Sequence, residues 1–270
     1  MTIVRNSRVL ITGAASGIGR LLALRLAESG SGLVLWDIDR EGLEQAQAEL
    51  AAAGHDAHTY ACDLTDRAEI AAVATKTLAE SGPIDILVNN AGIVSGKALL
   101  DLSDEEIERT FEVNTLALFW TVRAFLPSML EQDRGHVVTI ASAAGLAGAP
   151  KLTDYCSSKF AAFGFDESLR LELEKLGSAV KTTIVCPYYI DTGMFEGVKT
   201  RFSWLLPILK PEAVVRRIVR AIEKDRRRLV MPWFIYSSWL SRLLPVAWYD
   251  ALMDFFGITR SMDEFHGGGE

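Results

Sequence analysis

The 270-residue sequence has little cysteine and little histidine: it contains three cysteines and four histidines. Cys62, Cys156 and Cys186 are odd in number and widely spaced, and no CxxC pair or Cys/His cluster occurs. This pattern favours a reducing compartment and predicts no metal site. We expect all of the scattered histidines to be solvated: His55, His58, His136 and His266.

The sequence also lacks an excess of positive charge and a long apolar run. The formal net charge is -7, from 28 basic and 35 acidic residues, which argues against a nucleic-acid partner and leaves a small molecule. No stretch reaches about 18 uninterrupted apolar residues, and the N-terminus enters a strand pattern directly, without a signal-peptide pattern. We therefore expect no transmembrane helix, no export and a cytoplasmic location.

Short apolar runs alternate with helical patterns along most of the chain. The runs include RVLIT, GLVLWD, HVVTIAS and VKTTIVCP, and two of the helical patterns cover about 104–130 and 153–176. Such strands are typical of a parallel sheet that is buried on both faces. The sequence predicts a single α/β domain over 1–270, a doubly wound, Rossmann-type parallel sheet with helices on both faces. Its ligands are expected at the carboxyl ends of the strands.

A glycine-rich turn, TGAASGIG, follows the first strand. Gly13, Gly17 and Gly19 let the backbone approach a pyrophosphate, and the next helix offers its N-terminal N–H groups. Asp37 ends the following strand, where a carboxylate accepts hydrogen bonds from the ribose diol of NAD and repels a 2'-phosphate. The alternative is that Asp37 caps a helix together with Asp39.

Two further strand ends carry polar side chains. Asp63 ends the third strand, where it either meets an adenine amino group or caps the helix that begins near Asp66. NNAG, residues 89–92, ends the fourth strand. Its amides and small side chains suit a position beside a cofactor, but a turn without a ligand has the same composition.

The segment DYCSSKF, residues 154–160, places Tyr155 and Lys159 four residues apart. On a helix this spacing brings the two side chains to one face, about 5–6 Å apart at Cβ. A nearby cation favours the phenolate, so the pair can act as a general acid and base near neutral pH. An ordinary surface helix can carry the same spacing.

TGAASGIG, NNAG, a serine 13 residues before the tyrosine and YCSSK together resemble the short-chain dehydrogenase/reductase family over about 5–225. The resemblance implies that Tyr155 is the catalytic acid/base and that Lys159 lowers its pKa and binds the nicotinamide ribose. Ser142 would orient the substrate oxygen, and Asn114 would hold a water in a proton relay to Lys159. The residues alone leave open a cap role for Ser142 and a plain helical role for Asn114.

The resemblance also implies NAD as the cofactor and a set of cofactor-binding residues. These are Gly13, Ser16, Gly17, Ile18, Gly19, Asp37, Asp63, Leu64, Asn90, Ala91, Gly92, Tyr155, Lys159, Pro187, Ile190 and Thr192. The sequence departs from the family pattern in PYYIDTGM, where Tyr188 replaces the usual glycine after Pro187. A bulky group is therefore expected near the nicotinamide.

Longer stretches such as FEVNTLALFWTVRAFLPSML resemble the branch of retinol dehydrogenases and lipid-droplet 17-beta-hydroxysteroid dehydrogenases. This resemblance implies an NAD-dependent oxidoreductase that interconverts a lipophilic alcohol (steroid, retinoid or long-chain) and its ketone or aldehyde. It also implies a homodimer or homotetramer. The alternatives are an NADPH-type carbonyl reductase, such as a 3-ketoacyl thioester reductase, and a low-turnover lipid-associated cofactor-binding protein.

The chain becomes richer in aromatic residues after Met194, with four of the six tryptophans. By the same resemblance, 194–210 forms a lid, and its apolar composition predicts an apolar substrate. Residues 229–262 are expected to form an apolar helical extension that either touches a membrane surface peripherally or packs against the protein or a second subunit. The basic stretch 216–228 is either solvated or faces lipid headgroups. The tail GGGE, 267–270, is interpreted as disordered or cloning-derived.

Overall fold

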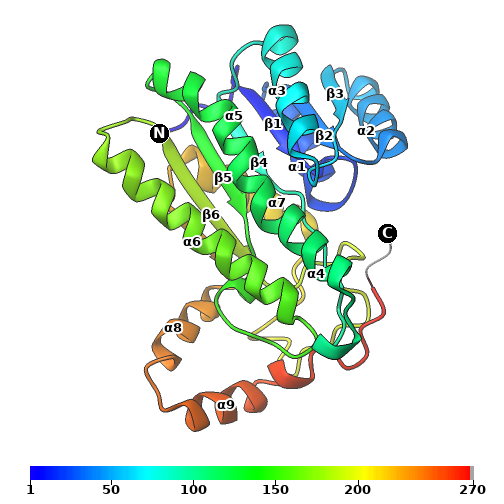
Figure 1. The fold of residues 1–270 in the computed structure, drawn as a ribbon, viewed down its shortest axis with the longest axis vertical. Helices are drawn as coiled ribbons and strands as arrows, with labels where there is room; N and C mark the ends of the chain where they lie inside the picture. The colour runs from blue at the N-terminus through cyan, green and yellow to red at the C-terminus, as the bar shows by residue number, and fades with distance from the viewer. Residues whose placement is uncertain (268–270) are drawn as a thin grey trace.

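A parallel sheet forms the centre of the molecule (Figure 1), as seen in a computed structural model that describes residues 1–267. Its strand order is β3-β2-β1-β4-β5-β6-β7. The strands are β1 (Arg8–Thr12), β2 (Gly32–Asp37), β3 (Ala57–Ala61), β4 (Ile86–Asn89), β5 (His136–Ile140), β6 (Lys181–Pro187) and β7 (Arg228–Met231). The interpretation of the tail concerns residues 268–270, which lie outside the described residues.

Helices cover both faces of this sheet. One face packs against α1 (Gly17–Glu28), α2 (Arg40–Ala52) and α7 (Pro211–Glu223), and the other against α3 (Arg67–Ser81), α5 (Ala117–Glu131) and α6 (Thr153–Lys175). The strands alternate between the two cores: Val9 and Ile11 belong to the first, whereas Leu10 belongs to the second. Because both faces are buried, central strands such as β1 and β4 consist mainly of apolar residues. The predicted doubly wound fold is confirmed.

Asp37 and Asp63 were possible caps of α2 and α3, but other carboxylates cap these two helices. Asp39, not Asp37, caps α2 by accepting a hydrogen bond from the Gly42 N–H. Asp66 caps α3, whereas Asp63 accepts hydrogen bonds from the backbone and hydroxyl of Thr65. Asp37 and Asp63 are therefore strand-end residues that do not cap the following helices.

A long helical stretch, Asp104–Glu131, contains α4 (Asp104–Phe111), a π-helical turn η2 (Glu112–Leu116) and α5. Within the described chain it is the one helix long and apolar enough to cross a membrane, with 44% of its most apolar window buried. Its elements contact α3, α6 and β4. These contacts make it part of the helical layer that covers the sheet.

The expectation that all four histidines are solvated is wrong for His136. This residue begins β5, a strand between two others, and is fully buried. Its ring nitrogens lie 2.8 Å from Thr2 Oγ1 and 2.7 Å from Thr183 Oγ1. Burial lowers the pKa of His136 to about 4, so the ring is neutral at pH 7.

The C-terminal segment begins inside the sheet, which corrects the predicted start of the extension. Residues 229–231 belong to β7, which pairs with β6 as the edge strand. The helical part follows as η4 (Trp233–Tyr236), α8 (Ser237–Ser241), α9 (Val246–Phe255) and η5 (Ile258–Arg260). Figure 1 shows α8 and α9 beyond the sheet, at the lower end of the molecule.

Candidate active site

The glycine turn between β1 and α1 is tied to the end of β4. Gly13 has φ of 64°, and a Cβ there would lie 2.8 Å from Ala91 Cα. Asn90 Nδ2 donates hydrogen bonds to the carbonyls of Thr12 and Gly13, both at 3.0 Å. A Cβ on Gly19 would lie 2.0 Å from the Gly13 oxygen. The turn therefore requires glycine at both positions.

The N-terminus of α1 fits an anionic group. Gly17 begins the helix with φ of 52°, and the nearest atom to a Cβ placed there is Thr192 Cβ at 3.8 Å. The N-cap Ser16 makes no side-chain cap bond, and the first turn contains no acidic residue. Free N–H groups and the helix dipole both favour a phosphate at such a terminus. This cradle fits the pyrophosphate of a dinucleotide, and Thr192 lies beside the start of the helix.

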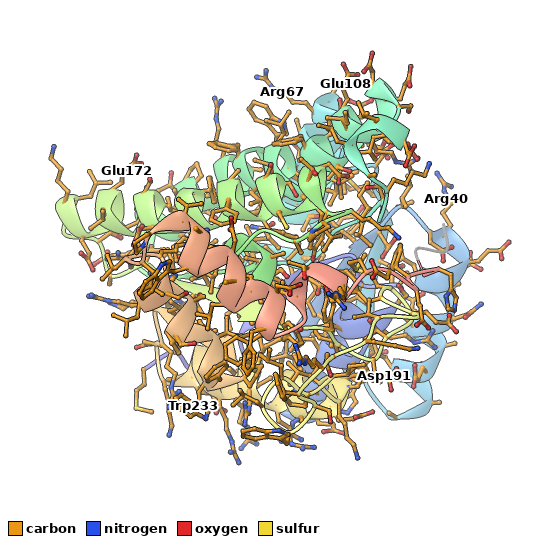
Figure 2. The ribbon with its side chains drawn as sticks, turned by 90° about the horizontal axis from the view of Figure 1, so that it is seen from below. Arg40, Arg67, Glu108, Glu172, Asp191 and Trp233 are labelled. Atoms are coloured by element: carbon orange, nitrogen blue, oxygen red, sulfur yellow. The ribbon has the colours of Figure 1, made fainter. Side chains whose placement is uncertain are left out.

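Asp37 lies beside the same turn. Its Oδ2 accepts a hydrogen bond from the Ala15 N–H at 2.8 Å, and its Oδ1 accepts one from the Asp39 N–H at 3.1 Å. The side chain is half-buried at the end of β2. Arg40, in the first turn of α2, extends outward from the protein (Figure 2). The carboxylate is therefore the charged group nearest the turn along this strand end.

The other predicted cofactor residues lie near the same edge of the sheet. Pro187 ends β6, while Ile18 and Ile190 pack partly buried against the core that contains β1. Asn90, Ala91 and Gly92 follow β4 directly, and the buried Leu64 follows β3. The structure thus brings the predicted residues to one edge, as expected for strand ends in a parallel sheet.

Tyr155 and Lys159 lie on one face of α6, and both are almost fully buried. Lys159 Nζ is 5.6 Å from the centroid of the Tyr155 ring and 3.3 Å from the Ile140 carbonyl oxygen, to which it donates. Within residues 1–267 no carboxylate forms an ion pair with this ammonium. Burial lowers the pKa of Lys159 to about 8.

Burial raises the pKa of Tyr155, and the neighbouring Ser142 hydroxyl opposes part of that rise. This direction is opposite to the lowering expected from Lys159, because loss of water around the phenolate is the largest effect. The spacing of Tyr155 and Lys159 in the sequence does not show that both side chains are removed from water. In the folded protein both groups favour their neutral forms more than they do in water.

Asn114 lies in the π-helical turn, so it is not a plain helical residue. Its Oδ1 accepts a hydrogen bond from the Ile93 N–H, and its Nδ2 donates to the Ile93 carbonyl, both at 2.9 Å. Nδ2 also lies 3.0 Å from Ser158 Oγ. A Cβ on Gly92 would be 3.1 Å from Lys159 Nζ and 3.2 Å from Asn114 Oδ1. Asn114 thus holds the segment after β4 beside Lys159; its part in a water relay remains a prediction.

Ser142 both caps a short helix and faces a cavity. It accepts a hydrogen bond from the Ala144 N–H at the start of η3 (Ala143–Gly145). Together with Tyr155 it lines a cavity of about 110 Å³. Most of the remaining wall is apolar and includes Phe195, Leu206, Phe234, Ile235, Met253 and Phe256. The site therefore opens into an apolar pocket.

Two contributors to this site were not identified from the sequence. Thr12 Oγ1 accepts hydrogen bonds from the N–H groups of Asn90 and Ala91, which fixes the end of β4. Asp154, buried at the start of α6, accepts hydrogen bonds from Ser95 and Thr110. The sequence did show a carboxylate, Asp154, directly before Tyr155. Its partners are distant in the sequence, so spacing alone did not reveal the contacts.

A family model for short chain dehydrogenase matches residues 7–201. The chain belongs to the short-chain dehydrogenase family. It is 48% identical to human epidermal retinol dehydrogenase 2 over 265 residues, which cover 97% of this chain and 86% of that protein. It is 46% identical to human estradiol 17-beta-dehydrogenase 11 over 244 residues, 90% of this chain and 80% of that protein. The predicted family and branch are confirmed.

Solved structures of short-chain dehydrogenases have the same fold. A short-chain dehydrogenase/reductase from Burkholderia phymatum in complex with NAD matches 90% of this chain and 95% of its own, with 29% identity and a TM-score of 0.82. A metagenomic short-chain oxidoreductase in complex with NADP matches 85% and 96%, with 29% identity and a TM-score of 0.71. This short-chain dehydrogenase is therefore an oxidoreductase of a family that binds nicotinamide cofactors.

Proposed function

We propose that this short-chain dehydrogenase interconverts a lipophilic alcohol and its ketone or aldehyde, with NAD as the cofactor. A steroid, a retinoid or a long-chain alcohol would suit it. The observation that carries the proposal is the apolar cavity onto which Ser142 and Tyr155 open. Pockets with apolar walls and a few polar groups bind apolar ligands in a fixed orientation. The names of the retinol and estradiol dehydrogenase relatives point to the same class of substrate.

The nicotinamide, when bound, supplies the acceptor or donor of the hydride. Ser142 orients the substrate oxygen, and Tyr155 removes the hydroxyl proton during oxidation or donates it during reduction. The buried Lys159 has no carboxylate partner in the described chain, so its charge acts on the phenol and the cofactor ribose. Asn114 fixes the backbone of Ile93 beside this lysine.

NAD is proposed over NADP because of Asp37. The carboxylate lies beside the glycine turn, where it accepts the Ala15 N–H and keeps further lone pairs for a ribose diol. A 2'-phosphate at that position would face the same negative charge. Gly17 and Thr192 would lie at the pyrophosphate and nicotinamide ends of this cofactor.

We propose that the segment 194–210 covers the pocket as a lid, because Phe195 and Leu206 form part of its wall.

The C-terminal extension exposes large apolar side chains, among them Leu243, Trp248 and Trp233, the last at the surface in Figure 2. These side chains fit peripheral contact of a cytoplasmic enzyme with a membrane or lipid surface. They also fit contact with a second copy in the proposed homodimer or homotetramer. Vesicle flotation tests the membrane contact, and gel filtration tests the contact with a second copy.

The proposal is tested by initial rates with NAD and with NADP across retinol, estradiol, long-chain alcohols and 3-hydroxyacyl thioesters. We expect turnover of lipophilic alcohols with NAD. Asp37→Ser should raise the preference for NADP over NAD by about 10- to 100-fold, because it removes the negative charge that repels the 2'-phosphate. Asp39→Ser should leave the preference unchanged.

Two other outcomes would favour the alternatives. Turnover of the thioesters alone with NADP would favour the carbonyl reductase. Cofactor binding without turnover of any substrate would favour the low-turnover binding protein.

A further inference from the structure

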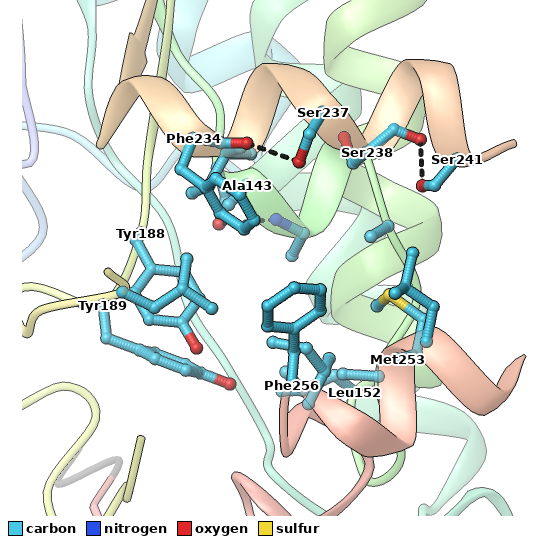
Figure 3. Close-up of a pocket in the computed structure, with 18 of the residues that line it drawn as sticks. Ala143, Leu152, Tyr188, Tyr189, Phe234, Ser237, Ser238, Ser241, Met253 and Phe256 are labelled. Carbon is cyan, nitrogen blue, oxygen red and sulfur yellow. Dashed lines mark hydrogen bonds between the residues drawn. The ribbon is translucent and has the colours of Figure 1, made fainter. Parts of the chain in front are cut away.

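The walls of the pocket carry five hydroxyl groups besides those of Ser142 and Tyr155. Tyr188 and Tyr189 lie side by side on one wall, and the serines of α8 stand on another (Figure 3). Three of the five are already hydrogen-bonded within the protein: Ser237 to the Phe234 carbonyl (2.7 Å), Ser241 to the Ser238 carbonyl (2.8 Å) and Tyr189 to Ser261 (3.0 Å). Those three have their main interactions satisfied without a ligand.

The remaining two hydroxyls differ in access. Ser238 Oγ is buried and has no partner in the described chain, and it is closed off from the open space. Tyr188 also makes no side-chain hydrogen bond within residues 1–267, but its oxygen is not among the sealed atoms. Tyr188 is therefore the non-catalytic hydroxyl that is both unengaged and open to the pocket.

The position of Tyr188 is fixed by its neighbours. Its N–H donates to the Met231 carbonyl at 2.7 Å, which holds the backbone after β6 against β7. Its ring lies 4.6 Å from that of Tyr189. Aromatic contacts continue from Tyr189 to Phe195 at 5.1 Å and from Phe195 to Tyr155 at 5.7 Å. The phenol of Tyr188 is thus held rigidly on the pocket wall, separated from Tyr155 by two rings along this series of contacts.

Tyr188 also links the catalytic residues to the extension. Its side chain packs against the apolar cluster that contains Tyr155 and against the cluster that includes Leu206 and Ile235. A substrate that extends from Ser142 and Tyr155 along the apolar pocket would cover the phenol. If that substrate had only its reacting hydroxyl, the Tyr188 hydroxyl would be buried without a partner, which disfavours binding.

On the basis of the proposed function, we propose that Tyr188 is a specificity residue that hydrogen-bonds a second oxygen of the substrate. The substrate class is then a lipophilic alcohol with an oxygen at a second position, as in a steroid diol. A site built around such a hydroxyl discriminates against an analogue that lacks the matching group. Tyr188 does not take part in proton transfer.

Estradiol and 3-deoxyestradiol test this directly, because they share the 17-hydroxyl and differ only in the distant phenolic oxygen. The kcat/KM for each is measured with NAD for the wild type and for Tyr188→Phe, which removes one oxygen atom. The wild type should prefer estradiol by about 5- to 150-fold, the range equivalent to 1–3 kcal/mol for an unpaired buried hydroxyl. Tyr188→Phe should reduce this preference to within about threefold.

The controls separate a local effect from a general one. Tyr236→Phe removes a phenolic oxygen from η4, outside the pocket wall, and it should keep the wild-type preference. Thermal unfolding and the KM for NAD should be unchanged in Tyr188→Phe. Quenching of tryptophan fluorescence measures the affinity for each steroid independently of turnover.

Each result has one meaning. An unchanged ratio in Tyr188→Phe, or an effect confined to the KM for NAD, would overturn the role of Tyr188 while leaving the proposed function intact. If the wild type oxidises no lipophilic alcohol, the proposed function fails and this inference fails with it.

Discussion

Replacing Lys159 with methionine should abolish turnover and make the protein more stable at pH 7. Burial lowers the pKa of this lysine from 10.5 to about 8, so the folded state holds its charge less readily than the unfolded state. At 1.36 kcal/mol per pKa unit, the charged lysine costs about 3 kcal/mol of folding free energy at pH 7. Loss of the hydrogen bond to Ile140 offsets about 1 kcal/mol of the gain. We expect Lys159→Met to be about 1–3 kcal/mol more stable.

The pH dependence supplies the sharper test. A lowered folded-state pKa means that wild-type stability rises as pH increases from about 8 towards 10.5, since the unfolded chain holds the proton over that range. The gain in unfolding free energy of Lys159→Met over the wild type should therefore be largest below pH 8 and disappear near pH 10.5. Urea unfolding at pH 7 and pH 10 measures it, with the exposed Lys175→Met on the same helix as the control. A variant that is less stable at pH 7, or a stability difference that is independent of pH, would show that burial does not lower the pKa of Lys159.

Three further changes probe the surroundings of the site. Asn114→Ala removes three hydrogen bonds of 2.9–3.0 Å. It should lower the free energy of unfolding in urea by about 3 kcal/mol and reduce kcat/KM. As the control, Thr121→Val in the same helical stretch should lower stability and retain kcat/KM. His136, with its pKa lowered to about 4, contributes stability above pH 6.5 that is lost as pH falls towards 4; unfolding titrations should show this slope in the wild type and not in His136→Gln. Burial raises the pKa of Asp166 to about 7, so its favourable protonated form is lost as pH rises through 7, and Asp166→Asn should be more stable than the wild type at pH 8 by calorimetry.

Local patterns predicted the parts of the site that depend on nearby residues. The glycine turn between β1 and α1 follows from the steric needs of one short segment, and the Tyr155–Lys159 spacing follows from helical geometry. The strands were visible because apolar runs with burial on both faces have a simple composition. These features follow from neighbouring residues, so the sequence order already contains them.

Properties that depend on tertiary packing were predicted less well. The pKa of Tyr155 rises because of burial by residues such as Phe195, which approaches from the segment after β6. His136 is buried because β5 lies between β4 and β6, which its scattered position did not indicate. Tyr188 lines the pocket between two apolar clusters, and this position depends on contacts between distant parts of the chain.

In the proposed reaction, Tyr155 assists hydride transfer between a carbinol carbon and the cofactor. The most direct measurement uses the preferred alcohol with deuterium on its carbinol carbon, followed by mass spectrometry of the reduced cofactor. The wild type should transfer the deuterium to NAD, and Tyr155→Phe, folded and able to bind NAD, should transfer it at least about 100-fold more slowly. Equal transfer by Tyr155→Phe and the wild type would exclude Tyr155 as the acid/base, and reduced cofactor without deuterium would exclude direct hydride transfer from the carbinol carbon.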